Sequence, residues 1–251
     1  MIDIRHLQKK YQTEAGEIEA LRDVTLSVQE GEFISIVGPS GCGKSTLLNI
    51  IAGLEAPGAG EVLIDGEVLS GPSRAIGYMP QRDELFPWRS IRGNVMLSLR
   101  LRHEKSEAPY RRAEELLRRY GLGDFAEKTP QQLSGGMRQR VALIRTLAAD
   151  PKILLLDEPF SALDYQTRLT VSDDIARIIR EEGKTAILVT HDISESISLA
   201  DTVYVLSARP GTVRTKRELM DLRHLSPMER REHPAFSAAF HDIWKELEQS
   251  V

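Results

Sequence analysis

Hydrophobic and polar residues change their spacing along the chain, and the changes predict three regions. In the first 80 residues, short apolar or alternating runs predict strands at 2–7, 18–28, 33–37, 61–64 and 75–78, with one helix at 44–52. A helical spacing follows from 91 to 149, with a break at 121–123. Strands at 153–156, 185–190 and 202–206 then alternate with helices at 166–182 and 194–200, and a last amphipathic helix is expected at 235–247.

Short apolar strands separated by helices predict a parallel sheet covered on both faces. We therefore expect an α/β chain organised as a single domain over residues 1–251. Its core would come from about 1–90 and 150–215, with a helical block at about 91–149 and a C-terminal extension at about 216–251.

Composition narrows the classes of protein that fit. The 251 residues are 41% hydrophobic and 28% charged, and the net charge of −4 predicts no nucleic-acid partner. No apolar run approaches the roughly 18 residues of a membrane-spanning helix. The charged N-terminal segment lacks the apolar core of a secretory signal, and the single cysteine, Cys42, excludes an intramolecular disulfide. Residence in the cytosol is therefore expected.

Residues 38–45 read GPSGCGKS, which matches the phosphate-binding motif GxxxxGK[ST] between an apolar strand and a helix. Its glycines let successive backbone N–H groups turn toward phosphate oxygens, and the positive end of the helix points to the same place. Lys44 is expected to reach the β- and γ-phosphates, and the Ser45 hydroxyl to ligate Mg²⁺. The alternative is a glycine-rich turn that only joins strand to helix. The predicted nucleotide-binding residues are Gly38, Pro39, Ser40, Gly41, Cys42, Gly43, Lys44, Ser45 and Thr46.

Cys42 inside this motif has two interpretations. It can be simply a small side chain in a tight loop. Alternatively, the nearby helix N-terminus favours the thiolate, which predicts a lowered pKa and sensitivity to alkylation.

A second candidate segment is ILLLDEP at 153–159, a buried strand that ends in two acids. In a parallel sheet, ligands collect at the carboxyl ends of the strands, so these acids are expected beside the phosphate loop. Asp157 would then hold Mg²⁺, and Glu158 would polarise the attacking water. An acid pair that caps a helix is the alternative.

LSGGMRQR at 133–140 opens a further helix, whose N-terminus is a second potential anion site. Taken alone, this segment is more typical of an ordinary N-cap and turn. One nucleotide does not obviously need two such sites.

With these three motifs in this order, the chain resembles the ATP-binding subunits of ABC transporters over nearly its whole length. The resemblance implies an ABC-type P-loop NTPase fold, with a mixed sheet core, an antiparallel β subdomain and an inserted helical subdomain. It also implies that Ser134, Gly135 and Gly136 contact the γ-phosphate held by an opposite subunit. Two chains, head to tail, would thus enclose two ATP molecules.

The resemblance assigns roles to residues that carry no strong signal by themselves. Gln81, in YMPQ, matches a glutamine that reaches Mg²⁺ and the attacking water, and His191, in LVTHD, matches a histidine that contacts the γ-phosphate. Asp164, in SALD, matches a residue of a loop that crosses the dimer interface, and Tyr11 lies where the family has an aromatic residue stacked on adenine. Without the resemblance, each of them is more typical of a solvated or packed side chain. The expected catalytic residues are Lys44, Gln81, Glu158 and His191, and the expected metal ligands are Ser45, Gln81 and Asp157.

Two features indicate a branch of the family. Met137 stands where many members have glutamine, so it cannot donate a side-chain hydrogen bond to the nucleotide. Residues 82–95, RDELFPWRSIRGNV, resemble a segment of nitrate, sulfonate and taurine importers, with a close relative in importers of pyrimidine precursors. The Phe86, Pro87 and Trp88 cluster would dock a short permease helix. Packing of its rings beneath the helical block is the alternative.

These features predict an ATPase that drives solute uptake at the cytoplasmic face of a membrane, to which it is peripherally bound. The resemblance implies a second copy of the nucleotide-binding subunit, two permease subunits and, indirectly, a solute-binding protein. An importer of pyrimidine precursors and a soluble, non-transport ABC ATPase remain alternatives. A module without hydrolysis is disfavoured because Lys44, Asp157, Glu158 and His191 occur together.

Overall fold

The computed structural model describes residues 2–14 and 16–249, and it divides into two compact units. Unit 1 consists of Met1–Ser73 and Gly183–Val251, and unit 2 of the intervening Arg74–Glu182. The last two residues of the predicted C-terminal extension lie outside the described residues.

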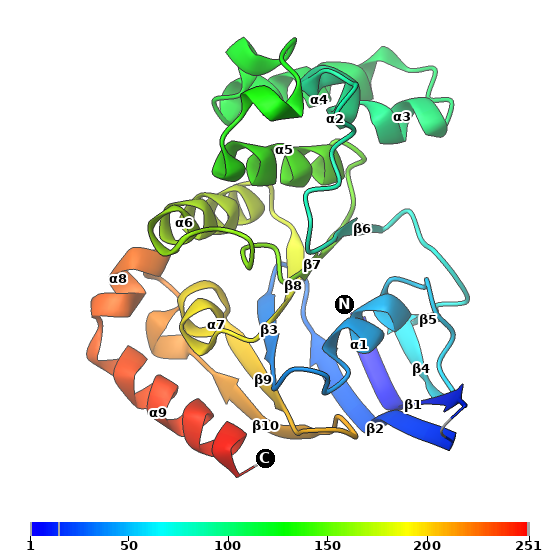
Figure 1. Ribbon diagram of the computed structural model, residues 1–251, viewed down its shortest axis with the longest axis vertical. Coiled ribbons are helices and arrows are strands. Elements are labelled where there is room, and N and C mark those ends of the chain that lie inside the picture. Colours follow the sequence, from blue (N-terminus) through cyan, green and yellow to red (C-terminus); the bar gives the residue numbers. More distant parts are fainter. Residues whose placement is uncertain (1, 15, 250–251) are drawn as a thin grey trace. The chain divides into compact units, whose positions relative to one another are not determined.

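Unit 1 contains an antiparallel sheet of order β2-β1-β4-β5 (Figure 1). Its strands are β1 (Ile2–Thr13), β2 (Gly16–Val28), β4 (Ala59–Ile64) and β5 (Glu67–Val68). The first two strands outrun their predicted bounds because they pair with each other as far as Thr13 and Gly16. Cross-strand backbone hydrogen bonds extend these strands through polar residues, which a hydrophobic pattern does not reveal.

A second group of unit 1 strands lies in the order β10-β9-β3-β8. They are β3 (Phe33–Val37), β8 (Thr185–Thr190), β9 (Thr202–Leu206) and β10 (Val213–Glu218). Strand β3 is parallel to both β8 and β9, whereas β10 is antiparallel to β9. Every residue of β3, β8 and β9 is buried, as expected for strands covered on both faces. The three parallel strands end at one edge, and α1 (Lys44–Ile51) and α7 (Ile193–Leu199) begin beyond it.

The C-terminal part of unit 1 packs against α7. It contains a short 3₁₀ turn (Met220–Leu222), α8 (Pro227–Glu232) and α9 (Pro234–Glu248). Arg230 of α8 is fully buried and donates hydrogen bonds to the carbonyls of Ile197 and Ala200 at the end of α7. Its Nη2 also lies 3.5 Å from Oδ1 of Asp201. The extension is therefore anchored by a satisfied buried charge.

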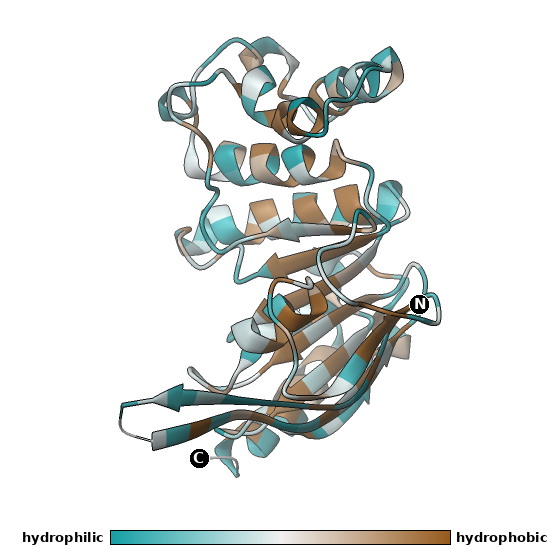
Figure 2. Cartoon of the chain, turned by 90° about the vertical axis from the view of Figure 1, so that its right-hand side faces the viewer, coloured by the Kyte–Doolittle hydropathy of each residue, from teal (hydrophilic) through white to brown (hydrophobic). Residues whose placement is uncertain are grey.

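Unit 2 contains the parallel pair β6 (Ile76–Met79) and β7 (Ile153–Asp157) with its helices. The helices are α2 (Ile91–Val95), α3 (Leu97–Leu101), α4 (Glu107–Arg119), α5 (Gly135–Leu147) and α6 (Tyr165–Glu181), with 3₁₀ turns at Gly123–Phe125 and Pro130–Gln132. Figure 2 shows hydrophobic residues alternating with hydrophilic ones along the helices, and in α5 the buried set includes Val141, Ile144 and Leu147.

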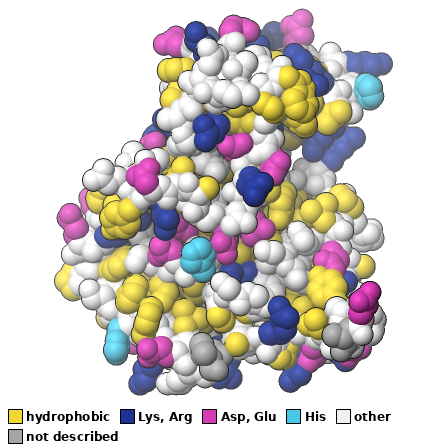
Figure 3. Space-filling model, viewed as in Figure 1, with side chains coloured by type: hydrophobic (Ala, Val, Ile, Leu, Met, Phe, Trp, Pro, Cys, Tyr) yellow, Lys and Arg dark blue, Asp and Glu magenta, His cyan; other side chains and the backbone are white. Residues whose placement is uncertain are grey.

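The surface in Figure 3 carries Lys and Arg side chains interspersed with Asp and Glu. Among residues 2–14 and 16–249, no helix combines the length and hydropathy needed to cross a membrane.

Candidate nucleotide-binding site

The phosphate loop follows β3 directly and leads into α1. Gly41 and Gly43 have φ angles of 75° and 102°, in the left-handed region that glycine adopts without a steric cost. Gly43 is the N-cap of α1. Because glycine has no side chain, the N-cap residue accepts no side-chain hydrogen bond from the N–H groups of the first turn. The loop therefore has the backbone form of an anion cradle.

Lys44 is held inside this loop. Its side chain is buried, and Nζ donates hydrogen bonds to the carbonyl oxygens of Gly38 at 2.7 Å and Pro39 at 2.9 Å. The ammonium is thus positioned where the loop closes, and it can exchange these carbonyls for the oxygens of a polyphosphate. Ser45, the next residue, is exposed.

Cys42 corrects one expectation. The thiol is only 1% exposed, and burial raises its pKa, although the ammonium of Lys44 acts in the opposite direction. The hypothesis of a lowered pKa is wrong because loss of hydration outweighs the nearby positive charge. The thiol packs as a small side chain.

Tyr11 contacts the start of α1. Its hydroxyl donates to Oε2 of Glu55 at 2.9 Å and lies 3.3 Å from Oγ1 of Thr46. Lys9 Nζ lies 5.3 Å from the centre of the ring, and burial raises the pKa of the phenol. Two predicted binding residues, Tyr11 and Thr46, are therefore brought together.

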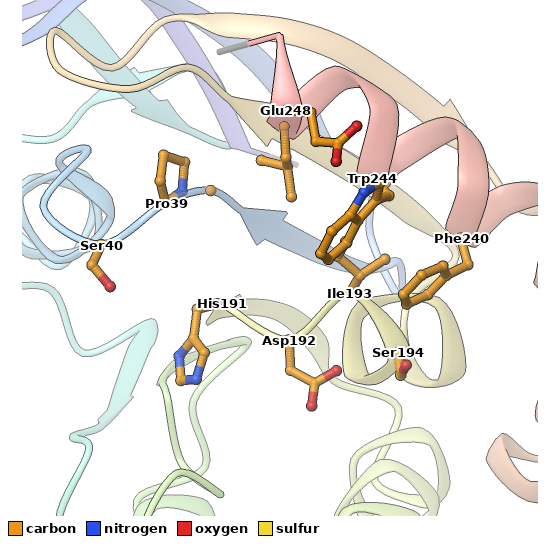
Figure 4. A pocket seen from close by; sticks show the side chains of 11 residues that line it. Pro39, Ser40, His191, Asp192, Ile193, Ser194, Phe240, Trp244 and Glu248 are labelled. Atoms are coloured by element: carbon orange, nitrogen blue, oxygen red, sulfur yellow. The ribbon is translucent and has the colours of Figure 1, made fainter. Parts of the chain in front are cut away.

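His191 follows β8 and faces the phosphate loop across a hollow. The next residue, Asp192, caps α7 by accepting a hydrogen bond from the N–H of Glu195 at 3.1 Å. The hollow has a volume of about 670 Å³, and its lining residues are Gly38, Pro39, Ser40, His191, Asp192, Ile193, Ser194, Phe240, Trp244, Leu247 and Glu248. In Figure 4, Pro39 and Ser40 lie on one side and Phe240 and Trp244 of α9 on the other. The structure thus brings His191 and the loop to one cavity.

The predicted acids lie at the end of β7 in unit 2. Asp157 Oδ2 accepts a hydrogen bond from the hydroxyl of Tyr78 at 3.1 Å. Burial of this hydroxyl, together with the carboxylate charge, raises the pKa of Tyr78, so the phenol stays protonated and keeps donating. Glu158 has a φ of 42°, in the left-handed region that non-glycine residues adopt less often.

Gln81 is linked to the same segment. Its Nε2 donates to Oγ of Ser161 at 3.2 Å, and that hydroxyl donates to the Glu158 carbonyl at 3.0 Å. The other atom of this amide, Oε1, is a hydrogen-bond acceptor and has the chemistry of a Mg²⁺ ligand.

Two further predicted residues cap helices in unit 2. Ser134 is the N-cap of α5, and its Oγ accepts from the N–H of Met137 at 3.3 Å. Asp164 is the N-cap of α6 and accepts from the N–H of Thr167 at 3.0 Å. Hydrogen bonds from the Thr167 side chain and from this N–H lower the pKa of the Asp164 carboxyl. Both helix starts therefore have an ordinary structural role within the single chain.

The predicted metal ligands have the right chemistry for Mg²⁺. Asp157 offers a carboxylate, Ser45 a hydroxyl and Gln81 an amide oxygen, and hard oxygen donors of these kinds suit this ion. Mg²⁺ bound with a nucleotide neutralises charge on its phosphates.

The comparisons with known proteins decide the family. A family model described as ABC transporter matches residues 21–161. This chain belongs to the ABC transporter family. The ABC ATPase predicted from the sequence is thereby confirmed, with ATP as the nucleotide that it binds and hydrolyses.

Relatives of this ABC ATPase match over most of its length. The ATP-binding protein YtlC of Bacillus subtilis is 46% identical and covers 98% of this chain and 95% of its own. The taurine import ATP-binding protein TauB of Jannaschia is 41% identical, with coverage of 86% and 81%. Other relatives are named for import of nitrate and of aliphatic sulfonates, so the branch resemblance is confirmed.

A solved cassette supports the same fold. The dimeric ATP-binding cassette MJ0796, bound to ADP and Pi, has a TM-score of 0.74 and 36% identity, covering 87% of this chain and 99% of its own. The predicted mixed sheet, antiparallel β subdomain and inserted helical subdomain are therefore confirmed.

Several residues that shape the ABC cassette were not predicted. Arg138 Nε lies 3.0 Å from Asp83 Oδ2, while Arg145 donates to the carbonyls of Asp83 at 2.8 Å and Glu84 at 2.6 Å. These arginines of α5 fix the segment that follows Gln81. Their spacing of seven residues on one helix was the available sequence signal.

The buried amide of Asn94 makes hydrogen bonds to the backbone at both ends of the segment 86–89. Asn94 accepts from the N–H of Phe86 at 2.7 Å and donates to the carbonyls of Phe86 and Arg89. Phe86 and Trp88 lie with their ring centroids 5.1 Å apart, and Trp88 is 73% exposed. Packing of the Trp88 ring beneath the helical block is therefore excluded.

Proposed function

We propose that this ABC ATPase energises an importer of small anionic or zwitterionic solutes of the nitrate, sulfonate and taurine class. Support comes from relatives named for the import of taurine, nitrate and aliphatic sulfonates. The observation that carries the ATPase role is the presence, in one chain, of a formed phosphate loop around Lys44 and of Glu158 beside Asp157 at the end of β7, whereas the solute class rests on those relatives.

Unit 1 would bind the nucleotide phosphates. The loop amides and the Lys44 ammonium contact phosphate oxygens, since the two carbonyls that now accept from Nζ are neutral and weaker partners than a polyphosphate. The ring of Tyr11, fixed by Glu55, faces the base, and His191 contacts the γ-phosphate.

Unit 2 would perform hydrolysis. Glu158 accepts a proton from the attacking water, and Gln81 orients that water through its amide. The proposed Mg²⁺ ligands of unit 2 are Gln81 and Asp157, and the ion would lower the cost of charge that develops on the phosphates. Tyr78 orients Asp157 through its hydroxyl.

A second copy of the chain would complete each site in a head-to-tail dimer. Ser134, Gly135 and Gly136 of one copy then meet the γ-phosphate on the other, and ATP binding closes the dimer. Dimeric solved cassettes that resemble this chain support the arrangement.

The assembly would lie at the cytoplasmic face of a membrane, peripherally bound to permease subunits. An exposed aromatic pair, Phe86 and Trp88, fits a short apolar permease helix because both rings are accessible and Asn94 fixes the backbone of Phe86. Trp88→Ala should weaken assembly with the permease and leave isolated nucleotide binding unchanged. Equal loss of both would contradict this role.

Reconstitution tests the substrate class. The chain would be placed in liposomes with its permease subunits and a solute-binding protein, and ATPase activity measured with nitrate, taurine, an alkanesulfonate or a pyrimidine precursor. Stimulation by one of the first three, lost in Glu158→Gln, supports the proposal. Stimulation by the pyrimidine precursor alone, or no solute dependence, overturns it.

A further inference from the structure

The turn between β9 and β10, residues 207–212, lies against the phosphate loop. Strand β3 pairs in parallel with β9 so that Val37 is opposite Val205, and the two chains therefore leave the sheet at the same edge. The loop begins at Gly38, and the turn, which reads SARPGT, begins at Ser207. Two segments about 170 residues apart in sequence are thus neighbours by topology.

Arg209 makes the polar contact between them. Its Nε donates a hydrogen bond to the carbonyl oxygen of Gly41 at 3.1 Å, although the side chain is exposed. A Cβ on Gly41 would lie 3.3 Å from the terminal nitrogen Nη2 of Arg209, so the guanidinium lies close to the loop backbone.

That carbonyl belongs to the peptide group joining Gly41 to Cys42. The N–H of this group donates to the Pro39 carbonyl at 3.3 Å, within the segment that cradles phosphate. A cationic donor on the oxygen fixes the plane of the peptide and polarises its N–H.

Gly211 makes the packing contact. A Cβ at this position would meet the carbonyl oxygen of Cys42 far inside van der Waals distance. Gly211 N–H donates to Ala20 O at 2.9 Å, and its own carbonyl accepts from the N–H of Arg22 at 3.0 Å. The turn is therefore tied to β2 on one side while it touches the loop on the other.

The turn is also rigid by itself. Ser207 Oγ donates to the Pro210 carbonyl at 2.9 Å and accepts from the N–H of Thr212 at 3.0 Å. In addition, the N–H of Ser207 donates to the carbonyl of Thr212 at 3.0 Å. Arg209 is thus presented from a fixed support, as a group that positions another group must be.

We infer that the SARPGT turn is a brace for the phosphate loop, with Arg209 as a positioning residue that acts on ATP through the Gly41–Cys42 peptide. The inference rests on the proposed role of the phosphate loop. The brace holds the loop in its binding conformation before ATP arrives, so it contributes equally to bound substrate and transition state.

Substitution of Arg209 tests the brace in the full chain. Arg209→Met keeps the aliphatic stem and removes the donor, and Arg209→Lys keeps a cationic donor. In Arg209→Met, KM for ATP and the calorimetric Kd should rise about five- to tenfold with kcat unchanged, the size expected for the loss of one typical, solvent-exposed hydrogen bond. Arg209→Lys should recover most of the affinity. Arg214→Met, a change at an exposed arginine on β10, should leave both constants unchanged.

The outcomes separate this inference from the proposed function. If Lys44→Ala abolishes ATP binding while Arg209→Met retains the parental KM, the brace is wrong and the phosphate loop stands. If Lys44→Ala also binds ATP normally, the proposed function fails. A lowered melting temperature in Arg209→Met with unchanged KM would indicate a purely structural contact and would also overturn the brace.

A second variant tests the packing contact. Gly211→Ala should displace the Cys42 carbonyl and raise the Kd for ATP at least as much as Arg209→Met. Gly71→Ala is its control, because a Cβ there meets nothing within 4 Å and the φ of Gly71 lies outside the left-handed region. Unchanged ATP affinity in a folded Gly211→Ala would contradict the inference.

Discussion

Helices α1 and α5 both begin at a glycine-rich segment, but their N-termini are capped differently. At α1 the N-cap is Gly43, which has no side chain to offer the N–H groups that follow. At α5 the N-cap is Ser134, whose hydroxyl accepts from the N–H of Met137. The first helix leaves its positive end to a ligand, whereas the second has already satisfied part of it.

The two helix starts therefore differ in what each can bind within one chain. The phosphate loop is a complete anion cradle within one chain, with Lys44 buried in it. The segment at Ser134 is a capped helix in the single chain, and in the proposed dimer it would meet a phosphate held by another copy. Loss of the first should abolish ATP binding, and loss of the second should affect the dimer.

The largest expected effect is that of Lys44→Ala. Removing the buried ammonium leaves no cation inside the loop and should reduce ATPase activity about 10²- to 10³-fold, with ATP binding lost in calorimetry. Ser134→Ala should bind ATP normally under the same conditions. Retention of more than a tenth of the activity in Lys44→Ala would show that the phosphate loop does not depend on its buried ammonium.

Glu158→Gln should separate binding from hydrolysis. The amide keeps the shape of the side chain but cannot accept the proton of water, so ATPase activity should fall about 10²-fold or more while ATP still binds. Size-exclusion chromatography with ATP should then show a persistent dimer. Glu84→Gln is a matched control, because Glu84 is another non-glycine residue with a positive φ, here 47°. Normal turnover in Glu158→Gln would exclude Glu158 as the base.

A smaller effect is expected for the reactivity of Cys42, in the loop that precedes α1. Since burial raises its pKa, the thiolate population at pH 7.5 is below that of a free thiol, and the thiol is sterically shielded. Alkylation by iodoacetamide, followed by mass spectrometry, should be at least about tenfold slower in the folded protein than in guanidinium, and should accelerate as the pH rises. Equal rates would show that the loop opens freely.

The smallest effect concerns Ser134→Ala. Loss of the cap should cost about 1 kcal/mol of unfolding free energy in urea titrations. Ser106→Ala, at the Ser106 N-cap of α4, should cost a similar amount. Only Ser134→Ala should also lower ATPase activity and ATP-driven dimerisation. Equal ATPase activities of Ser134→Ala and Ser106→Ala would mean that Ser134 only caps its helix.

The sequence was most informative where the signal is local. Strands β3 and β8 have their predicted bounds, and the glycine motif between β3 and α1 has the left-handed glycines that its chemistry requires. Strand β10 was missed because its residues, VRTKRE, are mostly charged and lie at an edge, where pairing with β9 alone defines the strand.

The rest depends on contacts that no local pattern encodes. Arg209 meets Gly41 across 168 positions, and only the parallel pairing of β3 with β9 brings them together. The alternative of a lowered pKa for Cys42 is wrong because the motif shows the nearby helix N-terminus but not the depth of burial.

The chain has two tryptophans, which lie in different units. Trp88 belongs to the cluster of Phe86, Pro87 and Trp88 in unit 2, and Trp244 lines the same hollow as Pro39 and His191 in unit 1. Removing either one therefore leaves a single tryptophan, which can be excited selectively, at a known position. Trp88→Phe would leave emission that reports nucleotide at the phosphate loop, and Trp244→Phe would leave emission that reports contact with a permease. The two halves of an energy-coupling cycle could be followed in real time without attaching a dye.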